Sequence, residues 1–237
     1  MVNSNKLSDK LTAIADGFRA SRGTTQEYSL DEMAAMAAEP VGGDDGNNAA
    51  VALLQGDVAE ITDENFPGLE ALAGGLDWVT KINHSTLKRV GSFYNASATV
   101  KIQSVVAPNL TTLLGGGTFR VCKYLERFVG GNVGTVTQSC FESSTKLAFA
   151  DFGGIGTISK WAFWGTALNT LVIRGDNVPA LVSTDAFDGS PFAAGKAGGT
   201  VYVKGALIEQ YKTATNWGAL YEGGSCAFAA IEGSEYE

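Results

Sequence analysis

The apolar residues of this chain follow a pattern with a period of more than twenty residues. Phenylalanine marks the pattern, and successive members lie 27, 26, 22, 22 and 24 residues apart. The six residues are Phe66, Phe93, Phe119, Phe141, Phe163 and Phe187. A period of this length predicts a solenoid, in which each repeat covers the apolar face of its neighbour.

The residues around each central phenylalanine share a frame. An apolar residue stands five positions before it, as Ile158 does for Phe163, and a leucine such as Leu168 follows five or six positions later. A short apolar run comes next, and Thr170–Ile173 has the composition of a strand buried between stacked neighbours. We therefore expect one short strand per repeat, with the phenylalanine filling the interior beneath it. The residues around the first, second and last phenylalanines match this frame less well, and terminal repeats of solenoids are usually atypical.

This frame resembles the BspA-type leucine-rich repeat, whose consensus is roughly I-G-x-x-A-F-x-x-C-x-x-L-x-x-V-x-I-P. The best matches are Ala162 and Phe163 with Leu168, Leu171 and Ile173, and Phe119 with Cys122, Leu125 and Phe128. The resemblance covers about residues 58 to 205, and a long polar loop after Phe93 leaves the register open there. It implies a β-rich leucine-rich-repeat solenoid of about six repeats, with short strands on one side and irregular structure on the other.

The hydrophobic pattern divides the chain into four parts. We expect a helical head at 1–40, a flexible acidic linker at 41–50, the repeats at 51–205, and a C-terminal cap and tail at 206–237. The segment Tyr202–Lys204 followed by Tyr211–Trp217 is similar to the end segment common after BspA-type repeats. In the cap we expect a helix over 206–213, packed on the last repeat through Leu207, Ile208 and Tyr211.

The head carries one apolar stripe at helical spacing. Its members are Leu7, Leu11, Ile14 and Phe18. Two heptads are too short for a stable free helix, so the stripe needs a partner. We expect it to dock or to form a homo-oligomer, and a trimer is one such arrangement. The segments 11–19, 23–25 and 28–34 resemble a short N-terminal module of tail-region proteins of phages and prophages.

Composition narrows the classes of partner. The 237 residues carry a net charge of −8, with a pI near 4.7, which argues against nucleic acid and anionic membranes as partners. Apolar runs are too short to span a bilayer, so we expect no membrane insertion. Residues 1–10 lack the apolar region of a secretory signal. Either the chain acts without that export route or a leader precedes this sequence.

Candidate chemistry is sparse. The single histidine, His84, would have to carry any triad or His-rich metal site, and its polar neighbours predict a surface turn. Asp44, Asp45 and Asn47 lack the spacing of a calcium-binding EF-hand loop. Glycine runs at 74–75, 115–117, 130–131 and 153–154 are not followed by Lys-Ser/Thr, and we expect tight turns at the corners of the repeats. No pair of carboxylates is singled out, so we expect no catalytic residue, no metal and no cofactor.

The three cysteines form an odd set. Cys122 and Cys140 each lie close to a repeat phenylalanine, where small buried residues are expected. We therefore predict buried thiols for these two and for Cys226 rather than a disulfide framework.

Aromatic residues are the better candidates for binding. Trp161 and Trp164 flank Phe163, and two tryptophans on one face could form a platform for sugar rings or a protein-binding hot spot. Alternatively, they cover the edge of the next repeat. Tyr94, Arg120 and Tyr124 hold comparable positions near other phenylalanines and could extend such a surface.

Together these features favour a non-enzymatic phage structural protein of the tail, baseplate or fibre region. Its head would contact other virion proteins, and its repeats would display a surface for a host protein or glycan. The alternative is a bacterial cell-surface adhesin with BspA-type repeats, which requires an export signal. An enzymatic role is a third reading, and it would depend on His84.

Overall fold

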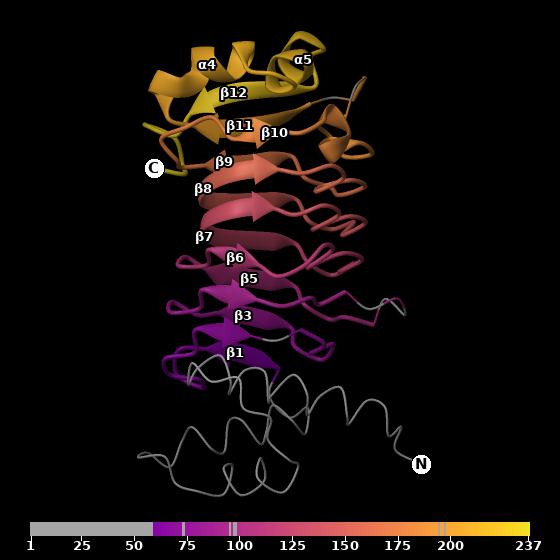
Figure 1. Ribbon diagram of the computed structural model, residues 1–237, viewed down its shortest axis with the longest axis vertical. Coiled ribbons are helices and arrows are strands. Elements are labelled where there is room, and N and C mark those ends of the chain that lie inside the picture. The colour runs from indigo at the N-terminus through magenta and orange to yellow at the C-terminus, as the bar shows by residue number, and fades with distance from the viewer. Residues whose placement is uncertain (1–58, 73, 95, 97–98, 194, 197) are drawn as a thin grey trace, which may run out of the picture.

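Short parallel strands stacked along one axis make up most of the structure (Figure 1). The computed structural model describes residues 59–72, 74–94, 96, 99–193, 195–196 and 198–237. The predicted head at 1–40, the linker at 41–50 and residues 51–58 lie outside the described residues. So does the predicted apolar stripe, with Leu7, Leu11, Ile14 and Phe18.

Within the described part of the chain, the larger sheet has the order β1-β3-β5-β7-β8-β9-β11-β12, and β10 pairs with β8. Every strand pair in it is parallel. Its strands are β1 (Glu60–Thr62), β3 (Lys81–Asn83), β5 (Ser104–Ala107), β7 (Arg127–Val136), β8 (Phe149–Ile158), β9 (Thr170–Ile173), β10 (Ala180–Leu181), β11 (Gly199–Val203) and β12 (Cys226–Ala230). The protein is therefore β-rich, and the predicted strand at residues 170–173 is confirmed as β9.

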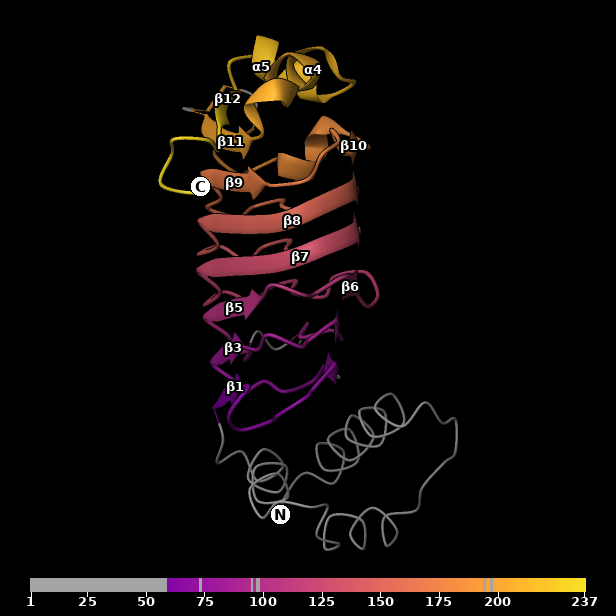
Figure 2. The ribbon, with the colours of Figure 1, turned by 90° about the vertical axis from the view of Figure 1, so that its left-hand side faces the viewer.

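A second, smaller parallel sheet corrects the expectation of one strand per repeat. Its strands are β2 (Ala71–Leu72), β4 (Arg89–Val90) and β6 (Thr112–Leu113). Each follows a strand of the larger sheet, so the opposite side of the stack is not irregular throughout. In the next two layers the chain forms single ten-residue strands, β7 and β8, which cross the side of the stack in Figure 2. Each of these strands contains three glycines, at 130, 131 and 134 in β7 and at 153, 154 and 156 in β8.

The strand register shows which residues of successive layers lie beside one another. Arg127 in β7 lies beside Phe149 in β8, 22 residues later, and Phe149 lies beside Thr170 in β9. Because side chains alternate along a strand, Phe128, Ala150 and Leu171 point together into the interior, where all three are buried. The period in the sequence therefore corresponds to one layer of parallel strands.

Five phenylalanine rings form a column through the interior, and we call it the phenylalanine column. Successive ring centroids lie 5.6, 5.5, 5.2 and 5.4 Å apart, with ring planes within 14° of parallel. The column consists of Phe93, Phe119, Phe141, Phe163 and Phe187, all of them buried. The predicted core role of these residues is confirmed. It is wrong for Phe66, which is only partly buried at the edge of the core.

The backbone beside the column is hydrogen-bonded from layer to layer. The Phe119 N–H donates to the Cys140 carbonyl and the Phe141 N–H donates to the Ala162 carbonyl, both at 2.7 Å. Phe163 continues the series with the Ala186 carbonyl at 2.7 Å. Buried backbone groups outside the strands thereby keep their partners, which the interior requires.

The sequence predicted that the glycine pairs lie at corners of the repeats. This prediction is wrong for two of them. Residues 130–131 lie inside β7 and residues 153–154 inside β8. A Cβ built on Gly131 would lie 2.5 Å from the Pro108 carbonyl oxygen and 2.9 Å from that of Leu110. These distances are too short for any side chain, so glycine at 131 permits the close approach of two layers.

A small cap closes one end of the stack. It begins with the 3₁₀ helix η2 (Gly205–Leu207) and the helix α4 (Ile208–Thr213), in agreement with the helix predicted at 206–213. Leu207 and Tyr211 are buried, and Ile208 packs against the core, as expected. The helix α5 (Trp217–Glu222) and the strand β12 were not predicted. A further 3₁₀ helix, η1 (Thr184–Phe187), precedes the cap.

Trp217 of α5 terminates the phenylalanine column. Its ring centroid lies 5.9 Å from that of Phe187, and its side chain is fully buried. The indole Nε1 donates a hydrogen bond of 2.9 Å to the Pro179 carbonyl. The last ring of the column is therefore covered, and the polar edge of the covering tryptophan is satisfied.

The three cysteines are free and buried, as predicted. Burial raises the pKa of each thiol, of Cys122, Cys140 and Cys226, to about 12. The thiols are therefore protonated at neutral pH and act as small apolar groups. No helix among the described residues has the length and hydropathy needed to cross a bilayer.

Candidate binding surface

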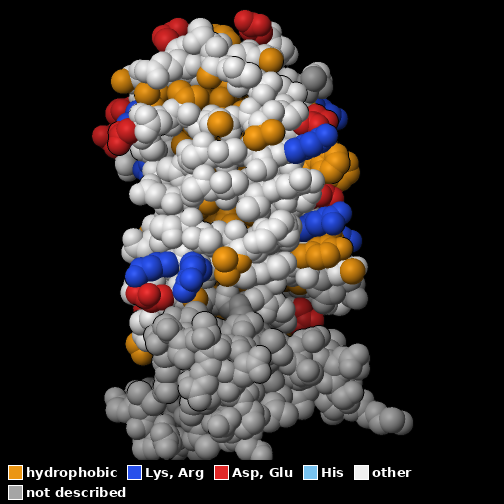
Figure 3. Space-filling model, in the orientation of Figure 1, with side chains coloured by type: hydrophobic (Ala, Val, Ile, Leu, Met, Phe, Trp, Pro, Cys, Tyr) orange, Lys and Arg blue, Asp and Glu red, His pale blue; other side chains and the backbone are white. Residues whose placement is uncertain are grey.

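Four exposed aromatic rings lie along one side of the stack, in the loops that carry the residues of the phenylalanine column. Tyr94 and Trp164 directly follow Phe93 and Phe163 of the column, and their side chains are 40% and 41% exposed. Tyr124 and Trp161 are exposed to 47% and 38%. In Figure 3, hydrophobic and basic side chains alternate down the right-hand edge, over the loops at the right of Figure 1.

A basic side chain accompanies three of these rings. The Arg120 guanidinium carbon lies 5.2 Å from the ring centroid of Tyr94. The ammonium nitrogen of Lys160 lies 4.5 Å from the Trp161 ring centroid, and that of Lys146 lies 5.7 Å from the ring centroid of Tyr124. We call the four rings and these three cations the aromatic stripe. Contacts of this kind add about 0.5–1 kcal/mol each at exposed sites.

Each cation of the aromatic stripe also has a carboxylate partner. Arg120 lies 2.8 Å from Glu142, Lys160 lies 3.3 Å from Asp185, and Lys146 lies 3.6 Å from Glu126. The side-chain hydrogen bond from Ser183 and the charge of Lys160 hold the pKa of Asp185 below its usual value. These pairs balance the charge locally, so the stripe presents rings and directed hydrogen-bonding groups rather than a net charge.

Five members of the aromatic stripe were singled out in the sequence as binding candidates, and two were not. Trp161, Trp164, Arg120, Tyr124 and Tyr94 are all partly exposed, on the side of the stack where the loops turn. Lys146 and Lys160 were missed. Both had a signal in the sequence, because Lys160 precedes Trp161 and Lys146 follows Tyr124 by one layer of 22 residues.

The backbone at Trp161 is strained. Its φ angle is +59°, in the left-handed region that non-glycine residues rarely adopt. Gly117 and Ser139 occupy the same position, two residues before a column phenylalanine, with φ of +71° and +58°. The turn itself therefore recurs in three layers, but only the third places a large ring on it. A bulky residue in a strained conformation is a reason to suspect a functional role.

Replacing Trp161 should reveal this strain directly. We expect Trp161→Gly to be more stable than Trp161→Ala by about 1 kcal/mol, because only alanine suffers the left-handed penalty. At Trp164, which is not at positive φ, the order should be reversed, with Trp164→Ala equal to or more stable than Trp164→Gly. Urea unfolding of the four variants measures both differences. If the alanine variant were more stable than the glycine variant at both positions, the result would contradict a strained backbone at Trp161.

His84 does not lie in a surface turn, and that prediction was wrong. The side chain is fully buried, because it follows the inward-facing Ile82 by two residues and so points to the same side. Its Nε2 lies 2.7 Å from the Phe66 carbonyl oxygen, and its Nδ1 lies 3.2 Å from Asp63 Oδ1. Backbone and side-chain hydrogen bonds from Ser85 lower the pKa of Asp63. These contacts tie the first layers together, and they give His84 a structural role.

Among the residues that the structure describes, no group of three or more His, Cys, Asp or Glu side chains is placed to hold a metal ion. The stretch with Asp44, Asp45 and Asn47 lies outside them.

An open groove of about 330 Å³ lies beside β8. Phe152 pairs with Ile173 and Thr157 with Ala180, so four residues of β8 face six residues, 174–179, of the next layer. The two extra residues bulge away and leave the middle of β8 without a strand partner on that side. The lining consists of Asn132, Val133, Gly134, Gly153, Gly154, Ile155, Gly156, Arg174, Gly175, Asp176 and Asn177.

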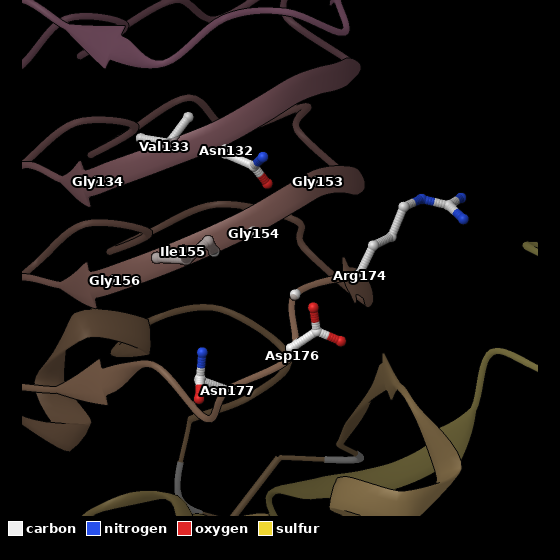
Figure 4. Close-up of a pocket in the computed structure, with 11 residues that line it drawn as sticks. Asn132, Val133, Gly134, Gly153, Gly154, Ile155, Gly156, Arg174, Asp176 and Asn177 are labelled. Atoms are coloured by element: carbon white, nitrogen blue, oxygen red, sulfur yellow. The ribbon is translucent and has the colours of Figure 1, made fainter.

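In Figure 4 the Asn132 amide lies between β7 and β8, and Asp176 and Asn177 project from the bulging loop. Arg174 extends away from the groove and forks onto Asp151, with both nitrogen–oxygen distances at 2.9 Å. Five of the eleven lining residues are glycines, whose backbone offers hydrogen-bonding groups to small polar molecules. The sequence did not predict this groove, because a two-residue excess between layers leaves no mark in the hydrophobic pattern.

Comparisons with protein-family models, with curated proteins and with solved structures find no match to this chain.

Proposed function

We propose that this chain is a non-enzymatic binding protein built as a leucine-rich-repeat solenoid of about six repeats over residues 51–205. On this proposal the aromatic stripe is its ligand-binding surface, and the ligand is a protein or a glycan on a cell surface. The observation that carries the proposal is the grouping of exposed rings with paired cations on one side of the stack. Rings supply contact area at low entropic cost, and the ion-paired groups supply oriented hydrogen bonds.

The strained backbone at Trp161 supports the same proposal. A ring that only covered the next layer would gain nothing from a left-handed turn, because glycine or serine serves that turn in the two layers before it. The exposure of Trp161 and Trp164 also leaves much of each ring accessible to a ligand.

We further propose that the protein belongs to a phage particle, in the tail, baseplate or fibre region. Support comes from the resemblance of segments between residues 11 and 34 to a module of phage tail-region proteins. In this proposal the helical head docks onto other virion proteins or forms a homo-oligomer, and the stack displays the aromatic stripe to the host.

The binding proposal is tested with the labelled full chain, candidate host cells and a glycan array. We expect the Trp161→Ala, Trp164→Ala double variant to bind at least about tenfold more weakly than the unmodified chain, because rings of this size dominate such surfaces. Tyr221→Ala is the matched control. Its ring is 39% exposed in the cap and also lies under a lysine, with Lys212 Nζ at 5.3 Å. If both variants lost binding equally, or if the double variant lost none, the aromatic stripe would not be the binding surface.

The location is tested by mass spectrometry of purified phage particles and of the cell-envelope fraction. A virion protein should be recovered with the particles in a fixed ratio to the other tail proteins. The alternative, a bacterial surface adhesin with BspA-type repeats, predicts recovery with the envelope and none with the particles. The aromatic stripe would serve either protein, so this experiment decides location independently of binding.

A further inference from the structure

The outer face of the larger sheet is partly covered by the last described residues of the chain. We call Glu232–Glu237 the tail segment. In Figure 1 it runs back beside β9 and β11, on the side away from the loops of the aromatic stripe. The strand side chains on this face are those that point away from the phenylalanine column. Two rows are defined by register, one through Arg127, Phe149 and Thr170, the other through Asp151, Val172 and Tyr202.

Tyr236 of the tail segment sits on this face between two aromatic rings. Its ring centroid lies 4.6 Å from that of Tyr202, at an interplanar angle of 66°, and 5.6 Å from that of Phe149, at 38°. The Arg127 guanidinium carbon lies 4.0 Å from the Phe149 centroid. One cation and three rings therefore form a continuous cluster that spans four strands.

Val172 lies on the same face, in the second row, between Asp151 and Tyr202. It points outward, because its neighbours Leu171 and Ile173 belong to the core, yet it is fully buried and outside the core cluster. Val129, which occupies the same row two layers away, is only partly buried. Asp151, which lies between these two valines in the row and pairs with Arg174, is buried as well. The side chains of this row are therefore buried over β8 and β9.

Hydrogen bonds hold the tail segment mainly in its own turn. The Ser234 N–H donates to the Ile231 carbonyl at 3.0 Å, and the Gly233 N–H donates to Glu237 Oε2 at 3.0 Å. The Glu232 carboxylate reaches the body of the protein, where it accepts a 2.9 Å hydrogen bond from the Gly205 N–H. Beyond Glu232, the attachment to the sheet comes from the ring contacts of Tyr236 and from its side-chain hydrogen bond with Thr170. The acidic residues Glu232, Glu235 and Glu237 flank the seated tyrosine.

We propose that Arg127, Phe149, Val172 and Tyr202 form a binding site for a tyrosine flanked by acidic residues in a segment of a partner protein, and that the tail segment occupies this site in cis. The tail segment itself defines the ligand chemistry, with a ring that packs on Phe149 and Tyr202 and with the Glu232 carboxylate, which interacts with the charge of Lys204. A partner has to displace Tyr236 in order to bind. The site is separate from the aromatic stripe, so this proposal does not depend on the proposed function.

The test uses a labelled synthetic peptide with the sequence of residues 230–237 and two forms of the full chain. We expect the peptide to bind the Tyr236→Ala chain at least about tenfold more tightly than the unmodified chain, because a tethered segment competes at an effective concentration of about millimolar. Chemical-shift changes at millimolar peptide concentrations report the binding. A peptide with alanine in place of tyrosine should not bind.

Further variants locate the site. Adding Tyr202→Ala to Tyr236→Ala should abolish peptide binding, whereas adding Trp161→Ala should leave it unchanged. Tyr221→Ala alone, which leaves the tail segment seated, should bind as weakly as the unmodified chain. Circular dichroism shows whether each variant is folded, and Arg127→Ala with Tyr236→Ala replaces the Tyr202 variant if that one is not. Equal binding to the folded Tyr236→Ala chain and the unmodified chain, or binding to neither, would overturn the proposal.

Discussion

Phe141→Ala is expected to destabilise the protein by about 3–5 kcal/mol, the cost of emptying a large, fully enclosed site. Phe141 lies in the middle of the phenylalanine column, with Phe119 at 5.5 Å on one side and Phe163 at 5.2 Å on the other. Phe128 of β7 also meets its edge at 5.0 Å. Because rings above and below are held by the layer spacing, the space cannot close when the ring is removed.

Urea unfolding followed by circular dichroism measures this change. Phe141→Leu should cost clearly less, because it keeps much of the buried volume. Tyr124→Ala is the control, since it removes a ring that is 47% exposed and one contact with Lys146, and we expect a change within about 1 kcal/mol. A loss below about 1 kcal/mol for Phe141→Ala would mean that the ring does not fill the interior.

Gly131→Ala is expected to cost about 2–3 kcal/mol, although it adds a single methyl group. The new Cβ would lie 2.5 Å from the Pro108 carbonyl oxygen, so the backbone of one layer has to move away from the next. Strand β7 pairs with neighbours on both sides, and such a shift strains hydrogen bonds on each.

Gly134→Ala provides the matched control in the same strand. A Cβ there has no atom within 4 Å, and neither glycine has a positive φ. We expect Gly134→Ala to be neutral or to stabilise by up to about 1 kcal/mol, since alanine loses less backbone entropy. Parallel urea titrations compare the two variants. Equal destabilisation in both would attribute the effect to strand β7 in general and contradict a close approach at Gly131.

The sequence predicted those parts of the fold that depend on a recurring local pattern. Phe119, Phe141 and Phe163 were assigned to the interior because the residues around them repeat, and the structure stacks their rings. The buried thiols of Cys122 and Cys140 followed from their positions beside repeat phenylalanines, and the helix near residues 206–213 was predicted separately, as part of the cap. Each of these features is fixed by side-chain size and spacing within a few residues.

Features that depend on contacts between layers were not predicted. The length of β7 and β8 depends on glycines that read as corners in the sequence but lie where layers approach closely, as at Gly131. The groove beside β8 arises from a difference in length between two segments. Tyr236 gives no sign in the sequence that it packs on Phe149 and Tyr202, which precede it by 87 and 34 residues. His84 was misread because its polar neighbours outweighed its alternation with Ile82.

The stacking of the layers gives the surface of the protein a constant spacing along its long axis. Adjacent parallel strands lie about 4.8 Å apart, whereas an extended peptide advances about 3.3 Å per residue. Four layers thus measure about 19.2 Å and six peptide residues about 19.8 Å. Because the side chains of an extended peptide alternate between its two faces, a peptide lying along the stack returns to register on the same face at every sixth residue. Ligands with matching side chains at that interval would meet equivalent positions four layers apart, and ligands with another interval would drift out of register.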